Sequence, residues 1–153
     1  RPKMLKRIIQ TAATMGVKDL YFIHSWKVEK SYWQTPWLSE EKLLENCILG
    51  LEQAKDTVMP TIHLRKRFKP FVEDELTAIS EGSLKLLAHP NSEHPCPSDI
   101  KTQTTLVIGP EGGFTPYEVG KLEEIGFDTV HIGSRILRVE TAVPVLLGRL
   151  FQA

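Results

Sequence analysis

Two short loops in the second half of the chain carry residues that could hold and act on a ligand. Residues 106–113 read Leu-Val-Ile-Gly-Pro-Glu-Gly-Gly, and residues 132–142 read Ile-Gly-Ser-Arg-Ile-Leu-Arg-Val-Glu-Thr-Ala. Glycines let a ligand approach the backbone closely, and Arg135, Arg138 and Glu140 add charge. Together the loops predict a binding site. Taken alone, the first could be an ordinary strand-to-helix turn and the second a salt-bridged helix entrance.

The glycine loop lacks the signatures of nucleotide phosphate binding. Its spacing differs from GxGxxG, and no GK[ST] follows it, so an uncharged or zwitterionic ligand fits it better than a pyrophosphate. The spacing of the other polar residues yields no Ser-His-Asp arrangement, and the five histidines show no HExxH pairing. We therefore expect neither a triad hydrolase nor a metal centre.

Individual histidines and the two cysteines can be assigned from their places in the predicted elements. His24 and His89 end predicted strands and could approach a site, whereas His131 alternates within a strand and is interpreted as structural. Cys47 and Cys96 lie far apart without CxxC spacing, which argues against a disulfide framework or a zinc site. Cys47 also falls on the apolar stripe of a predicted helix and is expected in the core.

The charge balance does not resemble that of a dedicated nucleic-acid binder. Lys and Arg together number 19, as do Asp and Glu, whereas neutralising phosphates usually requires a basic excess. The one basic run, 63–69, is interpreted as a solvated loop edge. Trp26, Trp33 and Trp37 could stack on a base, but packing under a loop is the preferred interpretation. No apolar stretch approaches the roughly eighteen residues that span a bilayer, and no signal peptide opens the chain, so we expect a cytoplasmic protein.

Alternating helices and strands must position the two loops. Helices are expected at about 3–15 ending at Gly16, after Ser39, around 70–80, from Thr115 to near Gly126, and over 143–151. Strands are expected at 19–23, 60–64, 84–89, 104–108 and 129–132, with a surface loop at 90–101. Ser39 provides an N-cap, and Thr115-Pro-Tyr-Glu118 matches a capping box. Pro144 is tolerated if it lies in the first turn, where N–H groups lack helical partners.

This order predicts an α/β fold with a mostly parallel sheet and helices on both faces. A chain of 153 residues can bury one such core. Ligands of parallel sheets bind at the carboxyl ends of the strands. The loops 89–90, 109–113 and 133–140 each follow a strand, so we expect them to emerge on the same side.

Three segments resemble the signature segments of a known enzyme family. They are Leu-Ala-His-Pro at 87–90, Ile-Gly-Pro-Glu-Gly-Gly-Phe at 108–114 with Glu118 in the next helix, and Gly-Ser-Arg-Ile-Leu-Arg-Val-Glu-Thr-Ala at 133–142. In this order and spacing they look like those of the 16S rRNA uracil-N3 methyltransferases, a family of the SPOUT superfamily. The likeness covers nearly the whole chain, and the last two segments are its most specific part.

The resemblance implies a fold and an assembly that spacing does not show. The C-terminal part of the sheet should form a trefoil knot, with the chain threaded through a loop, an exception to the unknotted rule. Its loops should hold S-adenosylmethionine in a bent conformation, and the active unit should be a homodimer whose partner completes each site. Family members also carry an N-terminal, barrel-like RNA-binding domain of the PUA type. We expect residues 1–153 to be the methyltransferase domain without it, which would explain the neutral charge.

Carried over position by position, the resemblance implies a cofactor pocket and two catalytic residues. The pocket would be lined by Leu87, His89, Pro90, Ile108, Gly109, Glu111, Gly112, Gly113, Ile132, Gly133, Ile136, Leu137 and Arg138. Arg138 would stabilise negative charge on the uracil as N3 loses its proton, and Glu140 would orient that arginine. Glu111 either takes part in the proton transfer or only orders its loop.

The leading hypothesis is an S-adenosylmethionine-dependent methyltransferase that modifies N3 of a uridine in 16S rRNA of the small ribosomal subunit. One alternative is a non-catalytic RNA-binding or ribosome-assembly module, and another is a methyltransferase acting on a different RNA. The presence of both Gly109–Gly113 and Arg138–Glu140 favours catalysis, because a binding module has no chemical need to keep both.

Overall fold

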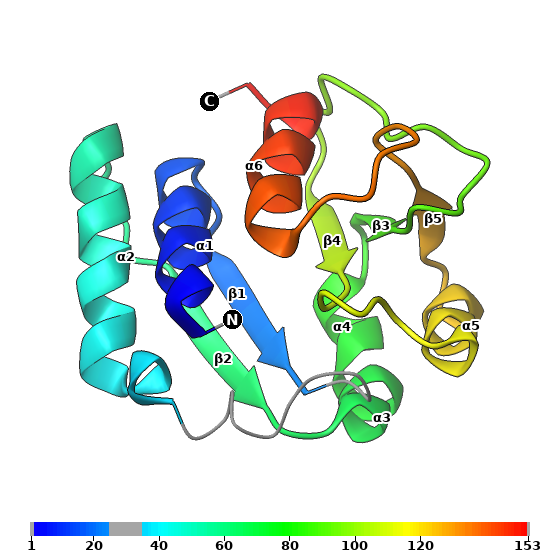
Figure 1. Ribbon diagram of the computed structural model, residues 1–153, viewed down its shortest axis with the longest axis horizontal. Coiled ribbons are helices and arrows are strands. Elements are labelled where there is room, and N and C mark those ends of the chain that lie inside the picture. Colours follow the sequence, from blue (N-terminus) through cyan, green and yellow to red (C-terminus); the bar gives the residue numbers. More distant parts are fainter. Residues whose placement is uncertain (1, 25–34, 153) are drawn as a thin grey trace.

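A computed structural model describes residues 2–24 and 35–152 of the chain (Figure 1). Its helices are α1 (Pro2–Thr14), η2 (Pro36–Leu38), α2 (Glu40–Ala54), α3 (Phe68–Phe71), η3 (Val72–Leu76), α4 (Thr77–Ser80), α5 (Pro116–Glu124) and α6 (Val139–Leu150). Its strands are β1 (Asp19–Ile23), β2 (Thr61–Arg65), β3 (Leu84–Ala88), β4 (Thr104–Ile108) and β5 (Asp128–Val130). Each predicted strand is therefore present within two residues of its expected bounds. The expectation for Trp26 and Trp33 lies outside the described residues, as does the side chain of Trp37.

Helix starts follow the local chemistry of the sequence. The Ser39 hydroxyl accepts the Lys42 N–H at 3.3 Å and caps α2. At α5 the capping box is complete, because the Thr115 hydroxyl accepts the Glu118 N–H and the Glu118 carboxylate accepts the Thr115 N–H. These bonds satisfy backbone groups that a helix leaves unpaired, so both predicted caps are confirmed.

The strand pairings are parallel. β1 pairs with β2 from Asp19↔Thr61 onward, and a second ladder has the order β4-β3-β5. His131 extends the end of β5 through an isolated parallel bridge to Pro95. The parallel pairing expected from the sequence is thus present, but the described strands form a two-stranded and a three-stranded sheet instead of one continuous sheet.

Helices cover both faces of these strands. Successive strand side chains point to opposite sides, and apolar ones on both sides are buried by helices. Leu87 packs in a core that α3, η3 and α5 supply with residues such as Phe71 and Leu122. Its neighbour Leu86 packs on the other side in a core that includes Leu146 of α6. Helices α1 and α2 bury Ile9, Leu43 and Cys47 against Phe22 and Ile62 of β1 and β2, and α1 also contacts α6. Figure 1 shows α1, α2 and α6 grouped together, with α5 at the opposite edge.

The structure corrects the predicted start of the last helix. Helix α6 begins at Val139, four positions before the expected 143, because the Arg138 carbonyl already accepts the N–H groups of Thr141 and Ala142. Pro144 therefore lies inside the helix, where it removes a bond to the Glu140 carbonyl, and the argument that placed it in the first turn is wrong.

The predicted helix at 70–80 is present but contains a π-helical turn, η3, between α3 and α4. No helix among the described residues has the length and apolar character needed to cross a membrane.

Candidate functional site

The glycine turn after β4 is shaped largely by the chain itself. The Gly113 N–H donates to the Pro110 carbonyl at 2.7 Å, and Gly113 has φ +76°, which side-chain-bearing residues rarely adopt. A Cβ on Gly109 would lie 3.1 Å from Cδ2 of Phe114. The conformation and packing of the turn therefore explain why glycine stands at 109 and 113. The turn leaves Glu111 exposed at its tip.

The loop before α6 leaves its backbone available. Gly133 has φ +119°, and its N–H donates to Nδ1 of His131 at 3.0 Å. The backbone groups of the next four residues, 134–137, make no hydrogen bond to any other described residue. Polar backbone groups normally find partners in protein or solvent, so this segment can offer donors and acceptors to a ligand.

The third loop, which follows β3, lies across the end of β5. The His89 N–H donates to the Val130 carbonyl at 2.9 Å, and the Cys96 N–H donates to the His131 carbonyl at 2.7 Å. Nδ1 of His89 accepts the Asn91 N–H at 3.2 Å. The ring nitrogens of His89 and His131 thus stabilise local turns, as expected for His131.

An open hollow of about 410 Å³ joins the tips of the glycine turn and the loop before α6. Glu111, Ile136, Leu137 and Arg138 line it, and all four belong to the pocket implied by the resemblance. Its volume is within the usual range of small-molecule sites. A second hollow of about 400 Å³ on the outer face of α2 contains none of the predicted residues.

Other predicted pocket residues lie in or near the core. The side chain of Leu87 is fully buried and packs with Phe71 and Leu122, so it can reach a ligand only through its backbone. Ile108 and Ile132 are half-buried against the cluster that includes α6. His89 is half-buried and Pro90 is exposed.

The two predicted catalytic residues stand at the start of α6. Arg138 is exposed and provides the N-cap position, whereas Glu140 is half-buried in the first turn, with its Oε2 buried. No ion pair joins their side chains in the part of the chain that the structure describes. The orientation of Arg138 by Glu140 therefore stays a prediction. Among the described residues no group of three His, Cys, Asp or Glu side chains is placed to hold a metal ion.

Phe114 is a positioning residue that residue spacing alone did not reveal. Its ring lies against Gly109 and packs on Phe68, with ring centroids 5.7 Å apart and an interplanar angle of 49°. It therefore fixes the glycine turn to α3. The one signal in the sequence is its place directly after Gly112-Gly113, where a large aromatic side chain has to bury its apolar ring by packing against a neighbouring element.

The sequence matches a known protein family, and the fold and the strand-end site agree with that match. Residues 1–151 match the RNA methyltransferase domain, so the chain belongs to this family. The family membership expected from the three segments is thereby confirmed.

The most informative relatives are proteins named ribosomal RNA small subunit methyltransferase E. The Borreliella burgdorferi protein, number 1 of that name, is 31% identical over 146 residues, which cover 93% of this chain and 59% of the relative. That of Mesomycoplasma hyopneumoniae is 27% identical over 150 residues, covering 97% and 64%. The chain thus spans about three-fifths of the length of these curated relatives.

Solved structures share the fold at lower identity. A probable rRNA methyltransferase from Porphyromonas gingivalis superposes with a TM-score of 0.75 at 23% identity, covering 97% of this chain and 61% of the other. The ribosomal RNA small subunit methyltransferase E of Neisseria gonorrhoeae, bound to S-adenosyl methionine, gives 0.72 at 24% identity, covering 95% and 59%. These likenesses confirm the fold class.

Proposed function

We propose that this chain is the catalytic domain of an S-adenosylmethionine-dependent methyltransferase that modifies N3 of a uridine in 16S rRNA of the small ribosomal subunit. The observation that carries the proposal is the hollow between the glycine turn and the loop before α6, lined by Glu111 and by Ile136–Arg138. It joins the two most specific family segments in one site. The names of the relatives support rRNA as the substrate class.

The residues around the hollow fit S-adenosylmethionine. The backbone groups of 134–137, which bond to no other described residue, can recognise the adenine edge, and the apolar side chains of Ile136 and Leu137 can cover its faces. The carboxylate of Glu111 has the sign that favours the positive sulfur and the ammonium group. When bound, the cofactor supplies an activated methyl group. The solved structures from Legionella pneumophila and Neisseria gonorrhoeae hold this molecule.

Methyl transfer has two requirements. N3 of the uracil must lie in line with the methyl carbon and the sulfur, and the N3 proton must leave. Arg138, exposed on the hollow, stabilises the negative charge that develops on the uracil. A C–N bond forms as the C–S bond breaks, and the N3 proton passes to a base or to water. Glu140 orients Arg138 in this proposal, which requires the exposed arginine to turn toward it when substrate binds.

The active unit in this proposal is a knotted homodimer. Ile136 is 86% exposed and Val145 of α6 is 42% exposed, which is apolar area that a second copy could cover. Because Ile136 also lines the hollow, such a partner would help to close the site. Analytical ultracentrifugation of the chain and of Val145→Asp tests this assembly, because a monomeric wild type would contradict it.

Calorimetry and a methylation assay test the function. We expect the chain to bind S-adenosylmethionine. The absence of any heat of binding at about 1 mM ligand would contradict the enzyme proposal. We expect Arg138→Ala to keep this affinity and to lower kcat on small-subunit rRNA by about 100- to 1,000-fold, the usual effect of removing one charge-stabilising donor. The control is Lys101→Ala, which changes an exposed cation before the amino end of β4. Unchanged turnover by Arg138→Ala would refute the role of the arginine.

A further inference from the structure

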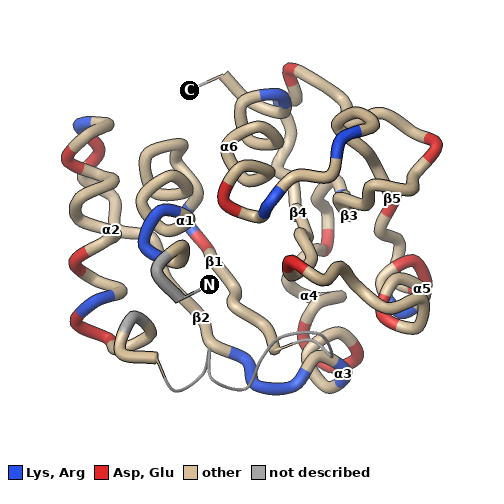
Figure 2. The backbone as a smooth tube through the Cα atoms, viewed as in Figure 1, with Lys and Arg blue, Asp and Glu red and all other residues tan. Residues whose placement is uncertain are grey.

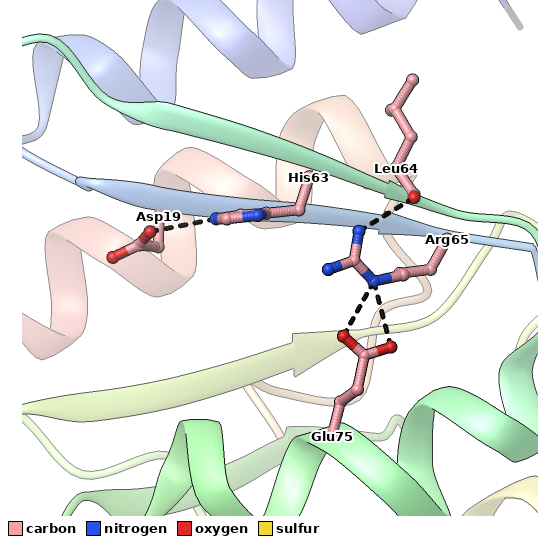
Figure 3. A network of polar contacts seen from close by, with 5 residues as sticks. All are labelled: Asp19, His63, Leu64, Arg65 and Glu75. Atoms are coloured by element: carbon pink, nitrogen blue, oxygen red, sulfur yellow. Dashed lines mark hydrogen bonds and ion pairs between the residues drawn. The ribbon is translucent and has the colours of Figure 1, made fainter.

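The basic turn, residues 65–69, runs from the end of β2 into the start of α3 and contains cations with different partners. Nε of Arg65 donates to both carboxylate oxygens of Glu75 at 3.0 Å (Figure 3). Lys69 reaches Glu73 only at 4.0 Å. Lys66 and Arg67 are exposed and make no ion pair or hydrogen bond with any described side chain. Lys66 and Arg67 therefore present positive charge that no described acidic side chain neutralises.

Acidic residues after the turn do not cancel this charge. Glu75 is held by Arg65, and Glu73 accepts a closer bond from Lys121 at 2.9 Å, which lowers the pKa of Glu73. Asp74 is the remaining exposed acid of this segment. Figure 2 shows residues 65–67 as a blue stretch where β2 leads into α3. In a chain whose formal net charge is +0, this is a local excess.

Packing ties the basic turn to the proposed methyl-transfer site. Phe68 stands between Arg67 and Lys69, and its buried ring packs on Phe114 at a centroid distance of 5.7 Å. Phe114 in turn directly follows Gly113 and lies against Gly109. One aromatic pair thus connects the cations to the glycine turn that forms one wall of the hollow.

We propose that Lys66, Arg67 and Lys69 bind backbone phosphates of the RNA substrate and hold its chain beside the hollow. The inference rests on the proposed function, because that function makes RNA the substrate. An acidic protein is the less fitting partner, since protein interfaces rely on a desolvated apolar or aromatic centre and the aromatic residue of this turn, Phe68, is buried. Phosphate contacts position a nucleic acid without reading its bases.

The salt dependence of RNA binding tests the proposal. Each phosphate neutralised on a single strand adds about 0.7 to the slope of log affinity against log salt. Replacing two cations should lower the slope by about 1.4. Between about 50 and 200 mM salt, the wild type should then lose about 7-fold more affinity than the variant.

The measurement uses fluorescence anisotropy of a labelled oligouridylate with the double variant Lys66→Gln/Arg67→Gln. The matched control, Lys55→Gln/Lys101→Gln, removes the same charge from two exposed lysines that form no ion pair in the described chain. We expect weaker binding and a lower slope for the basic-turn variant alone. Equal changes in both variants, an unchanged slope, or equally strong binding of polyglutamate would overturn the proposal.

Calorimetry with S-adenosylmethionine on the same variants separates this inference from the proposed function. We expect unchanged cofactor affinity in both, because Lys66 and Arg67 do not line the hollow. A wild type that binds oligouridylate through the basic turn but binds no S-adenosylmethionine would contradict the proposed function. A wild type that binds the cofactor but shows no salt-dependent RNA binding would contradict only the phosphate contact.

Discussion

Replacing Gly50 with alanine is expected to destabilise the packing of α1 on α2. Gly50 is buried, and a Cβ there would lie 2.5 Å from the Gln10 carbonyl oxygen and 2.7 Å from Cβ of Ala13. The Thr14 hydroxyl also donates to the Gly50 carbonyl at 3.1 Å, which holds the two backbones close. Because one clashing atom belongs to the backbone of α1, a side-chain rotation cannot relieve the overlap.

Two opposing effects set the magnitude. Overfilling a packed contact costs about 1–3 kcal/mol, and the higher helix propensity of alanine returns about 1 kcal/mol. The clash distances place this site at the upper end of the range, so we expect a net loss of about 1–2 kcal/mol in the free energy of unfolding. For a chain of this length the loss lowers Tm by about 2–8 °C.

Urea unfolding and thermal melts of Gly50→Ala measure the loss. Gly120→Ala is the matched control, since Gly120 lies inside α5 and an added Cβ meets no atom within 4 Å. There the propensity gain of about 1 kcal/mol acts alone and should raise Tm by about 2–4 °C. A Gly50→Ala protein as stable as the wild type would refute the close-packing argument.

Two further predictions concern acid and thiol chemistry. Lys18 donates to Asp56 at 2.6 Å, and this hydrogen bond lowers the pKa of Asp56. The bond therefore stabilises the fold above the ordinary aspartate pKa of about 4, and this stability is lost as pH falls through the lowered value. Asp56→Asn should unfold more easily than the wild type near neutral pH and equally easily in acid, and a stability difference that persists in acid would contradict this assignment. Burial raises the pKa of the Cys47 and Cys96 thiols, so a disulfide reagent should label them slowly in the native chain and rapidly in denaturant. Rapid native labelling of either thiol would show that its site is open.

Helix ends and strand positions could be predicted because their causes are local. Ser39 and Thr115 bond to backbone groups three residues away, so a short window of sequence contains both partners. The strands alternate with helices along the chain, which is enough to indicate a parallel sheet covered on both faces.

Features that depend on distant partners could not be predicted in this way. The close approach at Gly50 needs Gln10 and Ala13, some forty positions earlier. The start of α6 at Val139 was missed for a different reason: no capping side chain at Arg138 marks it, so Pro144 was wrongly placed in the first turn. The burial of the Leu87 side chain follows from which face of β3 the helices α3 and α5 cover.

The sequence by itself determined the two loops, the residue types within them and the family to which they belong. Only the tertiary structure decided that Glu111 meets Ile136–Arg138 across one hollow, because loops far apart in the chain come together only when parallel strands align. It also decided that Phe68, which lies within the basic turn, packs on Phe114 next to the glycine turn. The sequence shows that the cations of the basic turn exist, but their position relative to the site depends on the packing of buried side chains such as Phe68.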